Sequence, residues 1–130
     1  MVRRPALSRA EMEVARALWD LGEATVRQVF EALPAKRNLH FSTVQTYLRR
    51  LEAKGYAEAR IDARARIYTA RVKPETVIRE TVGELVQRLF DGQSLPLVQH
   101  LIEEGGMSRA DVARLREQLD RLEEDDHGAN

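Results

Sequence analysis

The sequence predicts a mainly α-helical protein with one small β-hairpin, arranged as a winged helix-turn-helix followed by a C-terminal helical unit. Three observations carry this expectation. Apolar residues recur at helical spacing in three segments before residue 55, two short alternating segments follow, and three further amphipathic segments complete the chain. We therefore expect two parts, over residues 1–73 and residues 74–130.

Composition limits the classes of protein to consider. A length of 130 residues predicts one domain, or one small domain with an appended oligomerisation segment. The absence of cysteine excludes disulfides, thiolate metal sites and a cysteine nucleophile. No apolar run approaches the roughly 18 to 20 residues of a membrane span, and the N-terminus lacks the apolar stretch of a signal peptide. We expect a cytoplasmic protein with no membrane insertion.

The formal net charge of zero hides a division between the two parts. Residues 1–73 contain 15 Lys/Arg and 8 Asp/Glu, a net charge of +7. Residues 74–130 contain 6 Lys/Arg and 13 Asp/Glu, a net charge of −7. A cationic first part suits a polyanionic partner, whereas the acidic second part suits a different task.

Each of the three helices expected in the first part begins with a capping box, in which Ser or Thr is followed three residues later by Glu or Gln. These pairs are Ser8 with Glu11, Thr25 with Gln28, and Ser42 with Gln45. Gly22, Pro34 and Gly55 mark the ends of the same helices.

After Gly55 the apolar period changes from helical to alternating. The segments "YAEARI" and "RIYTARV" predict two strands, and "DARA" between them predicts the turn of a hairpin, although it holds no glycine. Three arginines cluster around the tip of this hairpin: Arg60, Arg64 and Arg66.

The third helix has two unlike faces. Val44, Leu48 and Leu51 share one side, while the other carries short hydrogen-bonding side chains and two adjacent arginines. Such a face suits the major groove of DNA, because Gln and Arg make bidentate contacts to adenine and guanine edges. With the hairpin as a wing along the backbone, the expected DNA-binding residues are Ser42, Thr43, Gln45, Thr46, Arg49, Arg50, Lys54, Arg64 and Arg66. Arg3 and Arg4 are expected to hold phosphates.

The second part contains three amphipathic helices, beginning near Pro74, Ser94 and Ser108. Three such helices in 57 residues do not easily cover each other's apolar faces, so we expect a second copy of the chain to cover them. This makes residues 74–130 a helical dimerisation unit. The residues expected at its interface are Val82, Leu85, Leu89, Leu101, Val112, Leu115, Leu119 and Leu122.

The sequence can be compared with three other kinds of function: a protein-binding adaptor, an enzyme and a metal-binding protein. A winged helix can also serve as a protein-protein interaction adaptor, which remains the alternative function. No Ser, His and Asp arrangement and no glycine-rich phosphate loop occurs, so the sequence predicts no catalytic residues and no enzyme. His100, Glu103 and Glu104 have helical spacing but lack a second histidine, so we expect no metal site and no cofactor. Tyr47 and Trp19 are expected to pack in the core.

The chain resembles the penicillinase repressor family (BlaI/MecI type) of bacterial transcriptional regulators. The resemblance covers nearly the whole chain, through "LSRAEMEVARALWDLGEATVRQVFEAL", "STVQTYLRRLEAKGY", "RARIYTARV", "LFDG" and "ADVARLREQL". It implies a homodimeric repressor that binds a palindromic double-stranded DNA operator. It also places Thr43, Gln45, Thr46 and Arg50 at positions that face bases or phosphates.

Two branches of the family differ from this sequence. The copper-responsive branch ends in a cysteine cluster that this chain lacks, so copper sensing is not expected. In the β-lactam-responsive branch, a membrane sensor-protease system leads to cleavage of an Asn-Phe bond in the dimerisation region. The corresponding bond here joins His100 to Leu101, which leaves that route of induction open.

Overall fold

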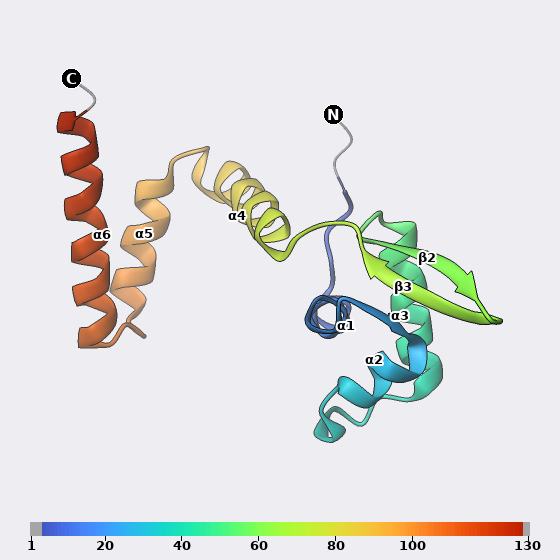
Figure 1. Ribbon diagram of the computed structural model, residues 1–130. Helices are drawn as coiled ribbons and strands as arrows, with labels where there is room; N and C mark the ends of the chain where they lie inside the picture. Colours follow the sequence, from blue (N-terminus) through green and yellow to red (C-terminus); the bar gives the residue numbers. More distant parts are fainter. Residues whose placement is uncertain (1–3, 129–130) are drawn as a thin grey trace. The chain divides into compact units, whose positions relative to one another are not determined.

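The computed structural model describes residues 4–128 and divides the chain into two compact units, one ending at Val82 and the other beginning at Gly83 (Figure 1). Arg3, one of the expected phosphate contacts, lies outside the described residues. The elements are, in order, α1 (Arg9–Leu21), β1 (Glu23–Thr25), α2 (Val26–Ala32), η1 (Ala35–Arg37), α3 (Phe41–Ala53), β2 (Ala57–Asp62), β3 (Ala65–Ala70), α4 (Pro74–Phe90), α5 (Ser94–Glu104) and α6 (Arg109–Gly128).

The first unit has the order of elements that the sequence predicts for a winged helix-turn-helix: three helices and then a hairpin. Its core is built from the apolar faces of α1, α2 and α3 packed on one face of the sheet. The apolar side chains that are at most 1% exposed lie at its centre: Val14, Leu18, Ala24, Val29, Val44, Leu48, Leu51 and Tyr68. Trp19 is partly buried against this core, as expected, and its indole N–H donates to the carbonyl of Val72 at 2.9 Å.

The sheet has three antiparallel strands in the order β1-β3-β2, so the expectation of a two-stranded hairpin was incomplete. The hairpin itself is confirmed, with Ala57 opposite Ala70 and Asp62 opposite Ala65. The additional strand β1 pairs Ala24 with Tyr68. Three residues are too few to show an alternating pattern, which is why the sequence did not indicate this strand.

The hairpin turn consists of Ala63 and Arg64, both of which have positive φ (49° and 69°). A two-residue turn of this kind normally contains Asn or Gly, because other side chains are strained in the left-handed region. Arg64, at the tip of the wing, therefore has a left-handed backbone conformation that is unfavourable for a residue with a side chain.

The start of α3 differs from the sequence prediction. The helix begins at Phe41 with His40 as its N-cap, and His40 makes no side-chain capping bond, so the prediction that Ser42 caps this helix was wrong. Ser42 is already inside the first turn, where its carbonyl accepts a hydrogen bond from the Thr46 hydroxyl at 3.0 Å. The packing of Phe41 against Phe30 favours the earlier start, and tertiary contacts of this kind override local capping signals.

The end of α3 is the glycine terminus that the sequence predicts. Gly55 has a φ of +89°, and its N–H donates to the carbonyl of Glu52 at 3.1 Å. The N–H of Tyr56 donates to the carbonyl of Leu51 at 2.9 Å, which completes a Schellman motif. The chain is thereby turned from α3 directly into β2.

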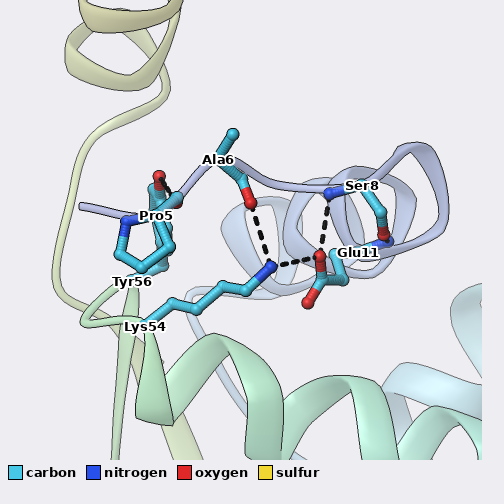
Figure 2. A network of polar contacts seen from close by, with 6 residues as sticks. All are labelled: Pro5, Ala6, Ser8, Glu11, Lys54 and Tyr56. Carbon is cyan, nitrogen blue, oxygen red and sulfur yellow. Dashed lines mark hydrogen bonds and ion pairs between the residues drawn. The ribbon is translucent and has the colours of Figure 1, made fainter.

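A polar cluster fixes the end of α3 against the start of α1 (Figure 2). One carboxylate oxygen of Glu11, which is only 1% exposed, accepts from the Lys54 ammonium at 2.7 Å and from the backbone N–H of Ser8 at 2.8 Å. Lys54 also donates to the carbonyl of Ala6 at 2.9 Å. Burial raises the pKa of Glu11, but the hydrogen bonds from Lys54 and Ser8 outweigh it, so the pKa lies below its ordinary value of 4.5.

The second unit contains no buried side chain among the described residues from 83 to 126. Its helices nevertheless carry large apolar residues that are more than a third exposed: Leu89, Leu95, Val98, Leu101, Ile102, Val112, Leu115, Leu119 and Leu122. Helix α4 contributes to both units, because Val77 in its first turn is buried in the core of the first unit.

The lowered pKa of Glu11 makes its contribution to stability dependent on pH. We expect Glu11→Gln to lower the free energy of unfolding by about 1 to 3 kcal/mol at neutral pH, because it replaces a buried charged acceptor of two hydrogen bonds by a neutral side chain. A lowered pKa in the folded state stabilises above the unfolded value, so the difference from wild type is lost as the pH falls below about 4.5.

Urea unfolding at a series of pH values measures this difference. Glu31→Gln, at an exposed carboxylate on α2, is the control and is expected to change little. A difference between Glu11→Gln and wild type that persists unchanged in acid would show that ionisation of Glu11 is not its source.

Candidate nucleic-acid interface

Helix α3 divides its side chains between the core and the exterior. Val44, Leu48 and Leu51 are at most 1% exposed and anchor the helix. The predicted contact residues lie on the remaining surface, where Ser42, Thr46, Arg49 and Arg50 are exposed and Thr43 and Gln45 are half-buried. The structure therefore brings these six predicted residues to the outer surface of one helix.

The outer surface of α3 is not neutralised by acidic side chains. Among the described residues, no carboxylate lies within ion-pair distance of Arg49 or Arg50. Arg50 lies 5.7 Å from the centre of the Tyr47 ring, a cation–π contact that leaves its N–H groups available. Tyr47 itself is partly buried against the core, as expected.

The arginines of the wing differ in their partners. Arg66 donates to both oxygens of Glu52 at 2.8 and 2.9 Å, and this hydrogen bonding raises the pKa of Arg66. Arg60 is likewise paired with Glu23 at 3.2 Å. Arg64 in the turn is exposed, and no carboxylate of the described chain pairs with it. Of the two wing residues predicted to bind DNA, Arg64 is therefore the more available.

Two further predicted cations hold the fold together. The Arg4 guanidinium pairs with Glu80 of α4 at 2.9 Å. The Lys54 ammonium is bound by Glu11 and by the carbonyl of Ala6, and its side chain is 26% exposed. A contact between either group and DNA stays a prediction, and it would require the cation to leave these partners.

One arginine outside the predicted set contacts the start of α3. Arg27 of α2 lies with its guanidinium carbon 4.8 Å from the centre of the Phe41 ring, at the first residue of α3. No local sequence signal indicates this contact, because the two residues are fourteen positions apart and meet only when α2 packs on α3.

The family model described as "Penicillinase repressor" matches residues 7–121, which is most of the chain. The chain belongs to the penicillinase repressor family. It is 36% identical over 116 residues to a transcriptional regulator BlaI of Mycobacterium tuberculosis, covering 88% of this chain and 84% of the relative. It is 24% identical over 120 residues to the penicillinase repressor of Bacillus licheniformis, covering 92% and 94%.

A comparison with solved structures agrees with this membership. The DNA-binding domain of the repressor BlaI superposes with a TM-score of 0.50 at 28% identity, covering 57% of this chain and 90% of that domain. The YusO protein of Bacillus subtilis superposes with a TM-score of 0.52 over 91% of this chain and 75% of that one, but at 14% identity it supports the fold alone.

Membership of this family makes the protein a DNA-binding repressor with a winged helix, and not an enzyme. The expectation from the sequence is confirmed at that level. Within residues 4–128, no helix is long and apolar enough to cross a membrane.

We predict that Arg50→Ala and Gln45→Ala weaken binding to a specific operator without unfolding the protein, because both side chains lie on the outer surface of α3. A lost bidentate contact to a base costs roughly 1 to 3 kcal/mol and relaxes the preference at one position. Fluorescence anisotropy on the operator and on its single-base variants measures both effects. If both variants bind the operator as tightly as wild type, α3 is not the element that recognises it.

Proposed function

We propose that the protein is a homodimeric repressor in which each copy inserts α3 into the major groove of one half of a palindromic operator. In this proposal the cationic residues 1–73 bind DNA, and the acidic residues 74–130 join the two copies. Two half-sites would then lie on one side of the duplex, spaced by whole turns of about 34 Å.

The observation that carries this proposal is the outer surface of α3, where Arg49 and Arg50 have no acidic partner among the described residues. A solvated helix surface normally mixes acids with bases, and neighbouring carboxylates would repel phosphates. Here Gln45, Arg49 and Arg50 combine base-edge donors with unneutralised charge, as major-groove recognition requires.

Homodimerisation is supported by the exposed apolar residues of the second unit. Leu119 and Leu122 are 59% and 63% exposed in the single chain, and Leu101 is 48% exposed. Apolar surface of this extent is unfavourable in water, and a second copy would remove it from solvent. Leu85 is half-buried, and the other expected interface residues (Val82, Leu89, Val112 and Leu115) are exposed as well.

Release from DNA would follow from damage to the dimerisation region. The bond between His100 and Leu101 lies inside α5, on exposed residues, so a protease would need to unwind this helix before cleaving it. We propose that a membrane sensor-protease system could act at this bond and that the repressor itself works in the cytoplasm.

The alternative function is a winged-helix adaptor that binds another protein. An adaptor has no need for exposed arginines without acidic partners beside Gln45 on α3, so the surface described above favours the repressor. A gel-shift experiment with a palindromic duplex selected from a random library, beside a scrambled duplex, decides between the two. Enrichment of a palindrome and its preferential retardation support the repressor, whereas a selection that enriches no duplex favours the adaptor.

We predict that Leu115→Asp or Leu119→Asp converts the protein to a monomer. Each places a charge on the apolar side of α6, where an unpaired buried ion is strongly unfavourable in the dimer. Sedimentation velocity measures the oligomeric state, and circular dichroism should show that the winged helix stays folded. Arg116→Asp on the same helix is the control for added negative charge. A variant that stays dimeric would place the interface elsewhere.

We also predict that a chain ending at His100 folds but binds the selected operator at least about tenfold more weakly, with lost cooperativity. It lacks α6 and part of α5, so two winged helices no longer bind as one unit. Titration of the operator with this chain and with the full-length protein measures the difference. Equal affinity and equal oligomeric state would contradict release by cleavage at this bond.

A further inference from the structure

The contact between Arg27 and Phe41 joins the two helices of the helix-turn-helix at the start of α3. The Arg27 guanidinium lies 4.8 Å from the ring centre of Phe41. The Phe41 ring packs edge-on against Phe30, with 5.7 Å between ring centres and 73° between ring planes. The exposed Arg27 side chain therefore lies over one aromatic ring, Phe41, which is itself packed against a second ring, Phe30.

The position of Arg27 is not that of an ordinary surface charge. Glu31 lies four residues further along α2, the spacing at which an arginine and a glutamate commonly pair on a helix. Among the described residues, no ion pair forms between them, and no other carboxylate pairs with Arg27. The guanidinium lies over Phe41 with its charge unneutralised.

Stacking on a ring leaves a guanidinium able to bind an anion. A guanidinium that lies over a ring keeps its N–H donors, which lie in its own plane and can hold two phosphate oxygens at once. Stacking also restricts the side chain, so less freedom is lost when the phosphate binds.

The location suits a phosphate and not a base edge. In a helix-turn-helix the second helix enters the major groove while the first crosses the sugar-phosphate backbone. Arg27 is on the first of these helices, α2, and contacts the first residue of the second, α3. A cation at this junction is placed to reach the strand that borders the groove.

We infer that Arg27 is a DNA-phosphate contact, and that Phe41, supported by Phe30, is the positioning residue that orients its guanidinium. This inference rests on the proposed function, in which α3 lies in the major groove. It adds a contact outside α3 and the wing, and one that carries no sequence information of its own.

The test uses the full-length protein with the selected palindromic duplex and the scrambled duplex of equal length. Arg27→Ala is expected to weaken binding to both duplexes by a similar factor, about tenfold at moderate salt. The plot of log affinity against log salt concentration should become less steep by about 0.9, the value for one lost phosphate contact. Arg16→Ala on α1, an exposed arginine in a groove beside Ile78 of α4, is the matched control and should change neither quantity.

The role of Phe41 is tested by a double-mutant cycle. Phe41→Leu should weaken binding when Arg27 is present, and should have little further effect when Arg27 is already alanine. Arg27→Lys should keep most of the salt slope, because the charge remains, yet bind less tightly than wild type, because an ammonium lacks the flat surface that stacks. Thermal melts of each variant identify any loss of binding that follows from unfolding.

The outcomes separate this inference from the proposed function. An unchanged salt slope in Arg27→Ala, with Arg50→Ala still impaired, overturns the phosphate contact and leaves the repressor intact. Additive effects of Arg27→Ala and Phe41→Leu overturn the positioning role. Failure of the wild-type protein to bind either duplex contradicts the proposed function itself.

Discussion

The end of α3 is tied to the start of α1 by one carboxylate oxygen of Glu11, which accepts from Ser8 and from Lys54 at the same time (Figure 2). The capping box that begins α1 and the ion pair that holds the end of α3 are therefore a single unit. Because Glu11 is 1% exposed, loss of either donor would leave charge in a poorly solvated place. The arrangement ties Lys54, at the end of α3, to the fold.

The net charge of +7 for residues 1–73 does not say where the excess positive charge lies, because ion pairs neutralise some cations locally and leave others without a partner. Arg4, Arg37, Lys54, Arg60 and Arg66 pair with carboxylates of the first unit. The cations without such partners in the described chain include Arg27, Arg49, Arg50 and Arg64, on α2, on α3 and in the turn of the wing. The location of unneutralised charge, and not its total, distinguishes the proposed DNA surface.

Local patterns predicted most of the fold, and tertiary contacts account for the differences. Helical periodicity and the glycine after α3 predicted the helices because these signals lie within a few residues. The start of α3 was predicted from Ser42, whereas packing of Phe41 on Phe30 begins the helix earlier. Contacts between residues far apart in the sequence also determine the site. Lys54 is bound by Glu11, 43 residues away, and Arg27 contacts Phe41 on α3. The polar surface of α3 could be predicted from the spacing of its residues. The spacing could not predict which neighbouring cations lack a carboxylate partner.

The second unit explains why a small repressor of this family would be sensitive to damage far from its DNA surface. None of its described side chains up to residue 126 is buried, so its apolar residues need a partner. A single winged helix that binds non-specifically at about 10⁻⁵ M is a weak repressor. Two of them joined at an effective concentration of about 10⁻³ M would bind at about 10⁻⁷ M, a gain of roughly a hundredfold without any new contact to DNA. In the proposed homodimer this gain depends on the helices that would join the two copies, so separating the copies would release the operator while α3 stays intact.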